Sequence, residues 1–162
     1  MFLYLISKFF LFIYIMKDIY IFIILIFLSL IIFFIDYFSN NLQKCLLKKK
    51  NNTKLIFISL IHHIFNIFMH FGWIFNNKRI LMFYLLLPVI TLIHWKTNND
   101  KCILTESVNK ICGFSRNNLF NDLFNMIGLK KYKLWNQKYH YVFLIVAILI
   151  TIYKITGFKF LF

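Results

Sequence analysis

The sequence predicts an all-α integral membrane protein, a bundle of about four transmembrane helices. Hydrophobic residues make up 61% of the 162 residues, whereas apolar residues form about 45–50% of an average soluble domain. Only four glycines and one proline interrupt the chain, so turn signals are sparse and the apolar runs are long. Such runs predict membrane-crossing helices, and the length leaves room for a single membrane domain.

The N-terminal region contains an extra apolar helix ahead of the first span. Residues 1–16 are apolar apart from Lys8, and residues 19–38 form a run long enough to cross a bilayer. A single helix over residues 1–38 would be about 57 Å long, about twice the thickness of the hydrocarbon core. We therefore expect residues 1–16 to lie at the interface or to cross separately as a short helix.

Three further spans follow, at residues 55–75, 80–96 and 139–157. The second and third are separated only by the polar turn "NNKR" at residues 76–79, so they must pack as an antiparallel pair. Pro88 lies inside the third span, where neighbouring helices can accommodate it.

A long amphipathic connection, residues 97–138, joins the third span to the fourth. Within it we expect helical pieces near residues 103–112 and 117–128. Leucine, phenylalanine and isoleucine share one face of residues 117–135, which end in basic residues. This pattern fits an interfacial helix on anionic lipid headgroups, or equally a helix that covers the bundle from the cytoplasmic side.

The distribution of positive charge predicts the orientation. Of the 19 lysines and arginines, 13 fall in residues 39–54 and 96–138, which share one side of a four-span bundle. The positive-inside rule places both loops in the cytoplasm and both termini outside. If residues 1–16 cross separately, the N-terminus moves to the cytoplasm. In either case the one glycosylation sequon, Asn51-Asn52-Thr53, is expected to face the cytoplasm and to stay unmodified.

The net charge of +14 would suggest nucleic acid in a soluble protein. Here the basic residues border apolar segments, so we expect the lipid bilayer and its anionic headgroups as partners, and no nucleic acid. A membrane-protein partner or a homo-oligomer stays open. The abundant Phe, Ile, Lys, Asn and Tyr all have AT-rich codons, so the 21% aromatic content indicates no function.

The three cysteines, Cys45, Cys102 and Cys112, form no CxxC motif. Their odd number and their spacing predict neither a disulfide framework nor a zinc knuckle. For loops in a reducing cytoplasm, we expect no structural disulfide.

Polar residues form a stripe on each of two spans, the second and the third. A spacing of three or four residues places a set on one helical face. Because a tight turn joins the two spans, we expect the two stripes to face each other. The stripe residues are Ser59, His63, Asn66, His70, Trp73 and Asn77, with His62 beside them, on the second span, and Tyr84, Thr91, His94 and Asn98 on the third.

Imidazoles on facing helices have three interpretations. Ionisable groups inside a membrane indicate a functional site by default, and His63 with His94 could bind haem iron or a transition metal. A wider metal-competent set adds His62, Cys102 and Glu106. The stripe could instead relay protons or line a substrate path. In the simplest interpretation, histidine and asparagine side chains hydrogen-bond across helices and hold the bundle together.

The stretch after the third span, residues 94–113, is the most distinctive chemically. Thr105 could cap a helix with Glu106 in its first turn. Alternatively Cys102, Glu106 and Asn109 lie at the cytoplasmic mouth of the bundle, next to His94.

These pieces resemble a family of small, uncharacterised four-helix membrane proteins, whose hallmark is a Cys-Pro-Leu-Thr-x-x-Glu stretch after a membrane helix. The resemblance covers about 50 residues. Ile103 stands where the family has proline. The acidic residue of this chain is Glu106, whereas the acidic residue of the family comes two positions later. It implies the architecture and a site, but no reaction. The composition also resembles that of membrane proteins of AT-rich large DNA viruses. The matching residues are His63, Gly72, His94, Cys102, Leu104 and Thr105.

Three function classes follow. The first is a structural or accessory membrane protein of unassigned activity, with the His/Asn stripe between spans two and three as interhelical glue. The second is a metal- or haem-binding redox protein that uses His63 and His94. The third is a small transporter or channel lined by the same stripe. The sequence contains no P-loop, HExxH or GxSxG motif, and five acidic residues argue against a two-carboxylate hydrolase, so no enzyme is indicated.

Overall fold

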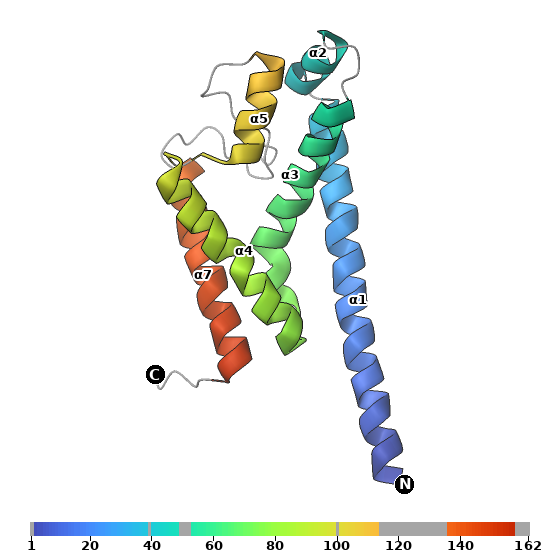
Figure 1. Ribbon diagram of the computed structural model, residues 1–162. Coiled ribbons are helices and arrows are strands. Elements are labelled where there is room, and N and C mark those ends of the chain that lie inside the picture. Colours follow the sequence, from blue (N-terminus) through green and yellow to red (C-terminus); the bar gives the residue numbers. More distant parts are fainter. Residues whose placement is uncertain (1, 39, 49–52, 100, 114–135, 158–162) are drawn as a thin grey trace.

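The computed structural model describes the chain at residues 2–38, 40–48, 53–99, 101–113 and 136–157. Within these ranges the protein is all-α, with six α-helices, one short 3-10 helix and no strand. Figure 1 shows their arrangement. The elements are α1 (Phe2–Tyr37), α2 (Asn40–Lys48), α3 (Thr53–Phe71), η1 (Gly72–Ile74), α4 (Lys78–Thr97), α5 (Ile103–Cys112) and α7 (Asn136–Thr156).

Three helices are long and apolar enough to cross a membrane. They comprise Met16–Tyr37, Thr53–Ile74 and Lys78–Thr97, and a shorter apolar stretch covers His140–Thr156. Large apolar side chains are exposed on all four, including Phe27 at 64%, as expected of surfaces that face lipid rather than water. The predicted all-α class is thereby confirmed, and three of the predicted four spans are helices that could cross a membrane.

The predicted division of the N-terminal region is not found, because α1 continues without a break from Phe2 to Tyr37. Lys17 and Asp18 lie inside it. Asp18 is buried, and its two carboxylate oxygens accept hydrogen bonds from the backbone N–H groups of Asn76 (2.8 Å) and Asn77 (2.9 Å). A charged residue that finds partners in this way does not need to end the helix.

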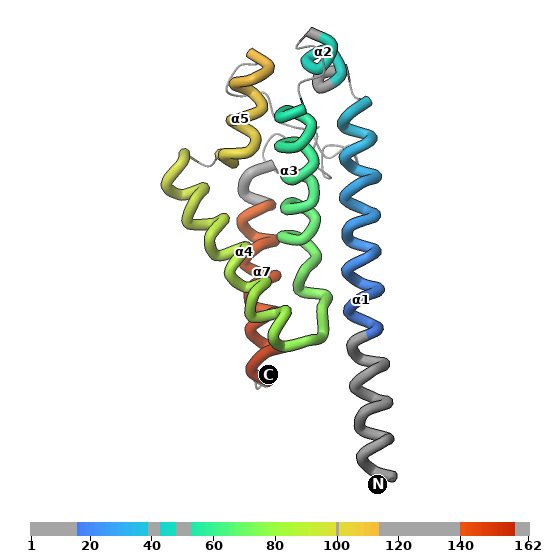
Figure 2. The backbone as a smooth tube through the Cα atoms, turned by 45° about the vertical axis from the view of Figure 1, so that its right-hand side comes forward, coloured from blue at the N-terminus to red at the C-terminus, as the bar shows by residue number. Residues whose placement is uncertain are grey.

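The helix α3 occupies the centre of the bundle. It packs against α1 on one side and against α7, α5 and the start of α4 on others, while α4 and α7 pack against each other. Figures 1 and 2 show α1 running beside α3, with α4 and α7 together on the opposite side. Every neighbouring helix can therefore present a side chain to α3.

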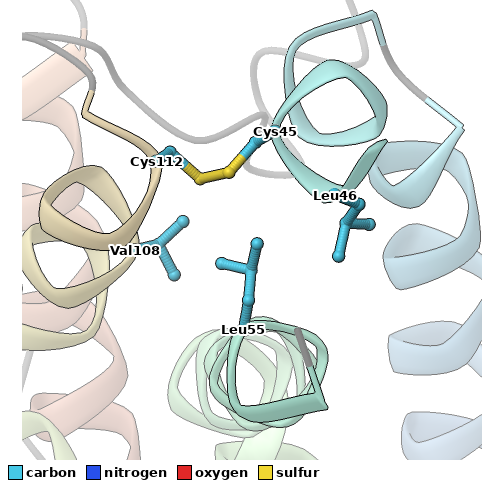
Figure 3. Packing of buried hydrophobic residues seen from close by; sticks show 5 residues of the cluster. All are labelled: Cys45, Leu46, Leu55, Val108 and Cys112. Carbon is cyan, nitrogen blue, oxygen red and sulfur yellow. A yellow bond between two sulfur atoms is a disulfide. The ribbon is translucent and has the colours of Figure 1, made fainter. Parts of the chain in front are cut away.

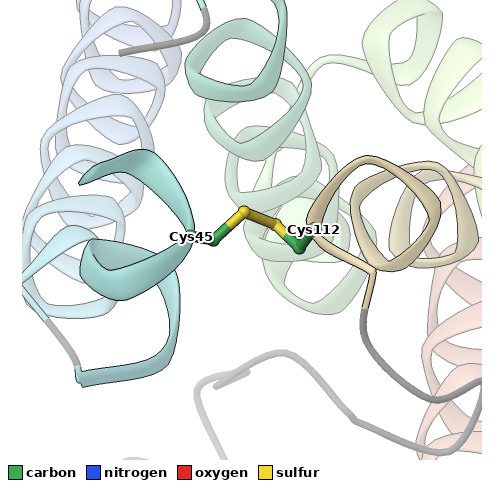
Figure 4. Close-up of a disulfide and its surroundings, with 2 residues drawn as sticks. All are labelled: Cys45 and Cys112. Atoms are coloured by element: carbon green, nitrogen blue, oxygen red, sulfur yellow. A yellow bond between two sulfur atoms is a disulfide. The ribbon is translucent and has the colours of Figure 1, made fainter. Parts of the chain in front are cut away.

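The short helices α2 and α5 lie together at one end of the bundle, and we call this pair the cap (Figure 1). A disulfide joins Cys45 of α2 to Cys112 of α5, with 5.4 Å between the Cα atoms (Figure 4). Beneath it, Leu46, Leu55 and Val108 complete a buried apolar cluster (Figure 3). The prediction of no disulfide is therefore wrong, since the fold brings together two cysteines that are 67 residues apart.

The predicted piece at residues 103–112 is confirmed as α5, but its start differs. The helix begins at Ile103, with Cys102 at the N-cap position and Gly113 in a left-handed conformation after its last residue. The prediction that Thr105 caps the helix is wrong, although Glu106 does lie in the first turn. The predicted segments 117–128 and 117–135, and Asn51 and Asn52 of the sequon, lie outside the described residues.

The tight turn between the second and third spans is confirmed. Asn77 caps α4 by accepting a hydrogen bond from the backbone N–H of Arg79 (2.9 Å). The ammonium of Lys154, from α7, donates to the carbonyl oxygens of Trp73 (3.0 Å), Ile74 (3.2 Å) and Phe75 (2.6 Å). With Asp18 holding the N–H groups on the other side, α1 and α7 together clamp this turn.

Candidate functional site: the polar face of α3

The most deeply buried polar pair joins α3 to α1. Nε2 of His63 lies 3.1 Å from Oδ2 of Asp36, and the two residues are only 1% and 2% exposed. The ring of Phe33 packs edge-on against the imidazole. Sequence reasoning missed Asp36, although an acidic residue at the end of an apolar run is a signal for a functional or partnered group.

A second pair joins α3 to α5. Nδ1 of His62 lies 3.8 Å from the Sγ of Cys102, the free cysteine among those described. His62 is buried and Cys102 is half-buried. The predicted proximity of Cys102 to the histidine stripe is thus found, but with His62 as its neighbour.

A third pair joins α3 to α7. Nδ1 of His70 donates to the carbonyl oxygen of Asn66 (2.7 Å), so in the neutral ring Nε2 carries the lone pair. That Nε2 lies 3.1 Å from Nδ1 of His140, which is placed to donate to it. The rings of Phe143 and Trp95 pack around the two imidazoles. His140 was also missed, because it is the only histidine of its span.

The polar residues of α4 have other partners. Nε2 of His94 accepts from the backbone N–H of Ile103 (3.3 Å), so this imidazole caps α5. Thr91 donates to a carbonyl oxygen one turn earlier in its own helix (2.8 Å). The amide of Asn98 donates to Glu106 (2.9 Å). His94 and Asn98, at the end of α4 and directly after it, thus hydrogen-bond to α5, which belongs to the cap.

The prediction that the stripes of α3 and α4 face each other is therefore wrong for the three histidines of α3. His63, His62 and His70 contact Asp36 of α1, Cys102 at the start of α5 and His140 of α7, while Tyr84 of α4 donates a hydrogen bond from its hydroxyl to the carbonyl oxygen of Met69 (2.7 Å). Nε2 of His63 lies against Asp36 and Nε2 of His94 against the N–H of Ile103, so the two predicted haem ligands have different partners.

The predicted metal ligands are divided among separate pairs. In the described part of the chain, no three His, Cys, Asp or Glu side chains form a group that could hold a metal ion. His62 pairs with Cys102, His63 with Asp36, and Glu106 with Asn98. The arrangement suits hydrogen bonding between helices better than the coordination of one ion.

Four of the predicted polar site residues remain to be placed. Ser59 is fully buried, and its Oγ has no hydrogen-bond partner among the described residues. The same holds for Oδ1 of Asn66. On α5, Asn109 is buried and Thr105 is half-buried. Two polar atoms on α3 thus lie inside the bundle, one turn on either side of His63.

No protein-family model, curated protein or solved structure matches this chain. The resemblance to small four-helix membrane proteins therefore stays a prediction, and the functional argument depends on this chain's own contacts.

Proposed function

We propose that the protein is a multi-pass membrane protein of structural or accessory role, in which the polar face of α3 holds the helices together. The observation that carries the proposal is that three histidines of α3 contact three different helices: His63 contacts α1, His62 contacts α5 and His70 contacts α7. A catalytic centre would direct such groups to one point, whereas each of these three contacts a different neighbour.

The energetic reason lies in the solvent. Lipid tails are as apolar as leucine, so apolar burial gives little drive for helices to associate, and side-chain hydrogen bonds between helices contribute about 0.6–1.7 kcal/mol each. An unpaired polar group inside the bundle costs more than this gain, roughly 1–3 kcal/mol. Each pair thus favours the observed neighbours over other arrangements of the same apolar helices.

We further propose that α7 is a fourth span. At 21 residues it would be about 31 Å long, close to the hydrocarbon thickness. It packs along α4, and its apolar stretch His140–Thr156 exposes Val142, Leu149 and Ile152. In a bilayer these exposed side chains would contact lipid.

Two signals bear on the side to which the cap faces, and they oppose each other. The excess of lysine and arginine in its loops favours the cytoplasm. The disulfide between Cys45 and Cys112 favours an oxidising compartment. We give the disulfide more weight, because its formation requires an oxidant, whereas charge bias is a tendency with exceptions. We propose that the cap faces an oxidising compartment, with Lys44, Lys54 and Lys110 exposed towards anionic headgroups or a partner protein.

Cys102 offers a direct test of orientation, since it is the free thiol among the described cysteines. On sealed cells, a membrane-impermeant maleimide should label the intact protein, and the Cys102→Ser variant should stay unlabelled. Labelling that appears once the plasma membrane alone is permeabilised would place the cap in the cytoplasm and contradict the proposed orientation.

The role itself is tested on protein purified in mild detergent, by metal analysis, an optical spectrum and thermal unfolding. We expect a spectrum without a Soret band, no stoichiometric metal, and lower unfolding temperatures for His63→Ala and His70→Ala. Phe57→Ala is the matched control, because Phe57 lies on the exposed face of the same helix. A metal or haem that is lost in the histidine variants would overturn the structural role.

A further inference from the structure

We infer that the polar face of α3 is a proton path, along which His62, His63 and His70 pass protons between the cap and the α3–α4 turn. This function goes beyond holding the helices together. It depends on the proposed membrane insertion, but on neither the proposed orientation nor the absence of a cofactor.

Titratable groups accompany α3 along most of its length, one level after another. From Ser59 to Phe71, the end of α3, the rise is about 18 Å, more than half of the roughly 30 Å hydrocarbon core. The levels are Cys102 with His62, Asp36 with His63, His140 with His70, and Lys154 at the carbonyl groups of η1. Asp18 lies close enough to Lys154 to interact with it electrostatically, next to the exposed Lys17.

The first two levels are adjacent. The rings of His62 and His63 lie with their centroids 5.7 Å apart, so groups from α5 and α1 meet at neighbouring imidazoles. Cys102, half-buried at the start of α5, is the outermost member. Protons from the aqueous side of the cap can therefore enter at this level.

The interval between His63 and His70 is about 10.5 Å along the helix, too long for direct transfer. Asn66 lies in this interval, and its buried Oδ1 has no hydrogen-bond partner in the described structure. Ser59 has the same property one turn on the other side of His63. Buried polar atoms of this kind are the usual positions of internal water, and water at Asn66 would connect the two imidazole levels.

The chemistry requires only proton transfer. A neutral imidazole accepts a proton at its unprotonated nitrogen and releases one from the other, so no other bond changes and no co-reactant is needed. At His70, Nε2 accepts a proton from Nδ1 of His140, and Nδ1, which lies at Asn66, releases its own proton to water at that position. A flip of the ring then restores the starting tautomer. A proton gradient or a membrane potential supplies the driving force for net proton movement.

A purely structural role and a proton path predict different effects when a titratable side chain is replaced by one that hydrogen-bonds but does not titrate. The changes Asp36→Asn and His70→Gln retain a hydrogen-bonding group at each pair, and they remove the ionisable one. If the contacts only hold helices, stability changes little and nothing else is lost. If they carry protons, stability is kept and transport is lost.

The test uses the full-length protein in liposomes that contain a pH-sensitive dye, with a potassium diffusion potential set by valinomycin. We expect proton flux above that of empty vesicles, loss of this excess in Asp36→Asn and His70→Gln, and normal flux in Phe57→Ala, whose side chain lies on the exposed face of α3.

Wild-type flux equal to that of empty vesicles overturns the inference, as does undiminished flux in both Asp36→Asn and His70→Gln. The wild-type comparison decides even if a variant fails to fold. Flotation and alkaline extraction of the same liposomes separate the two proposals: inserted protein without flux refutes only the proton path, and protein that does not insert refutes membrane insertion as well.

Discussion

Replacing both Cys45 and Cys112 by serine should loosen the cap while leaving the spans folded. The disulfide closes a loop of 67 residues, for which the chain-entropy estimate is about 4.4 kcal/mol. This value is an upper limit, since helices that stay inserted in the bilayer already restrict the loop. The apolar contacts of Leu46, Leu55 and Val108 remain, so we expect a partial opening of α2 and α5 rather than general unfolding.

Hydrogen exchange would measure this effect in the double serine variant, and maleimide labelling of the wild type would test the disulfide itself. Backbone amides of α2 and α5 should exchange faster than in the wild type, and those in the middle of α3 should keep their protection. Wild-type protein that is denatured without reductant should take up one maleimide, and three after reduction. Uptake of three without reductant would refute the disulfide, and unchanged exchange in the cap would refute its bracing role.

Three further changes test the clamp around the α3–α4 turn by thermal unfolding in detergent. Gly72→Ala places a Cβ into the ring of Tyr84 and should cost about 1–3 kcal/mol, but much less in a Tyr84→Ala background; an equal cost in both would disprove the close approach. Lys154→Met leaves three carbonyl oxygens without their ammonium and should destabilise by about 1–3 kcal/mol. Asp18→Ala removes both acceptors of the N–H groups in the turn and should also cost about 1–3 kcal/mol. Lys17→Ala, at an exposed neighbour, should leave stability unchanged. Equal effects of Asp18→Ala and Lys17→Ala would contradict the clamp.

The sequence predicts the helices well because their determinants are local. Apolar runs specify where a chain can cross lipid, and the predicted spans at residues 55–75 and 80–96 agree with α3 plus η1 (Thr53–Ile74) and with α4 (Lys78–Thr97) to within two residues. The join at Lys17 and Asp18 was misjudged, because the partners of Asp18 come from a turn 58 residues later. A charge that looks like a helix boundary in isolation is satisfied by tertiary structure.

The partners of the polar residues could not be predicted in the same way. Periodicity shows which residues share a face of α3, but not which helix that face meets. His63 pairs with Asp36, 27 residues earlier, and His70 with His140, 70 residues later. A short turn suggested α4 as the partner, yet in the structure α1, α5 and α7 surround the stripe.

The cysteine pairing shows the same limit. Three cysteines allow three pairings, and spacing alone does not choose among them. Cys45 and Cys112 meet because α2 and α5 both fold over the end of α3 at Leu55. The expectation of a reducing compartment came from charge counting, which carries no information about this contact.

A double-mutant cycle on His63 and Asp36 tests most directly the central claim, that polar pairs of α3 join it to its neighbours. The free energy of unfolding is measured in detergent for the wild type, His63→Ala, Asp36→Ala and the double variant. We predict a coupling of about 1 kcal/mol, with the double variant less destabilised than the sum of the single ones. Additive effects, within about 0.3 kcal/mol, would mean that the two side chains do not interact, and would contradict the account.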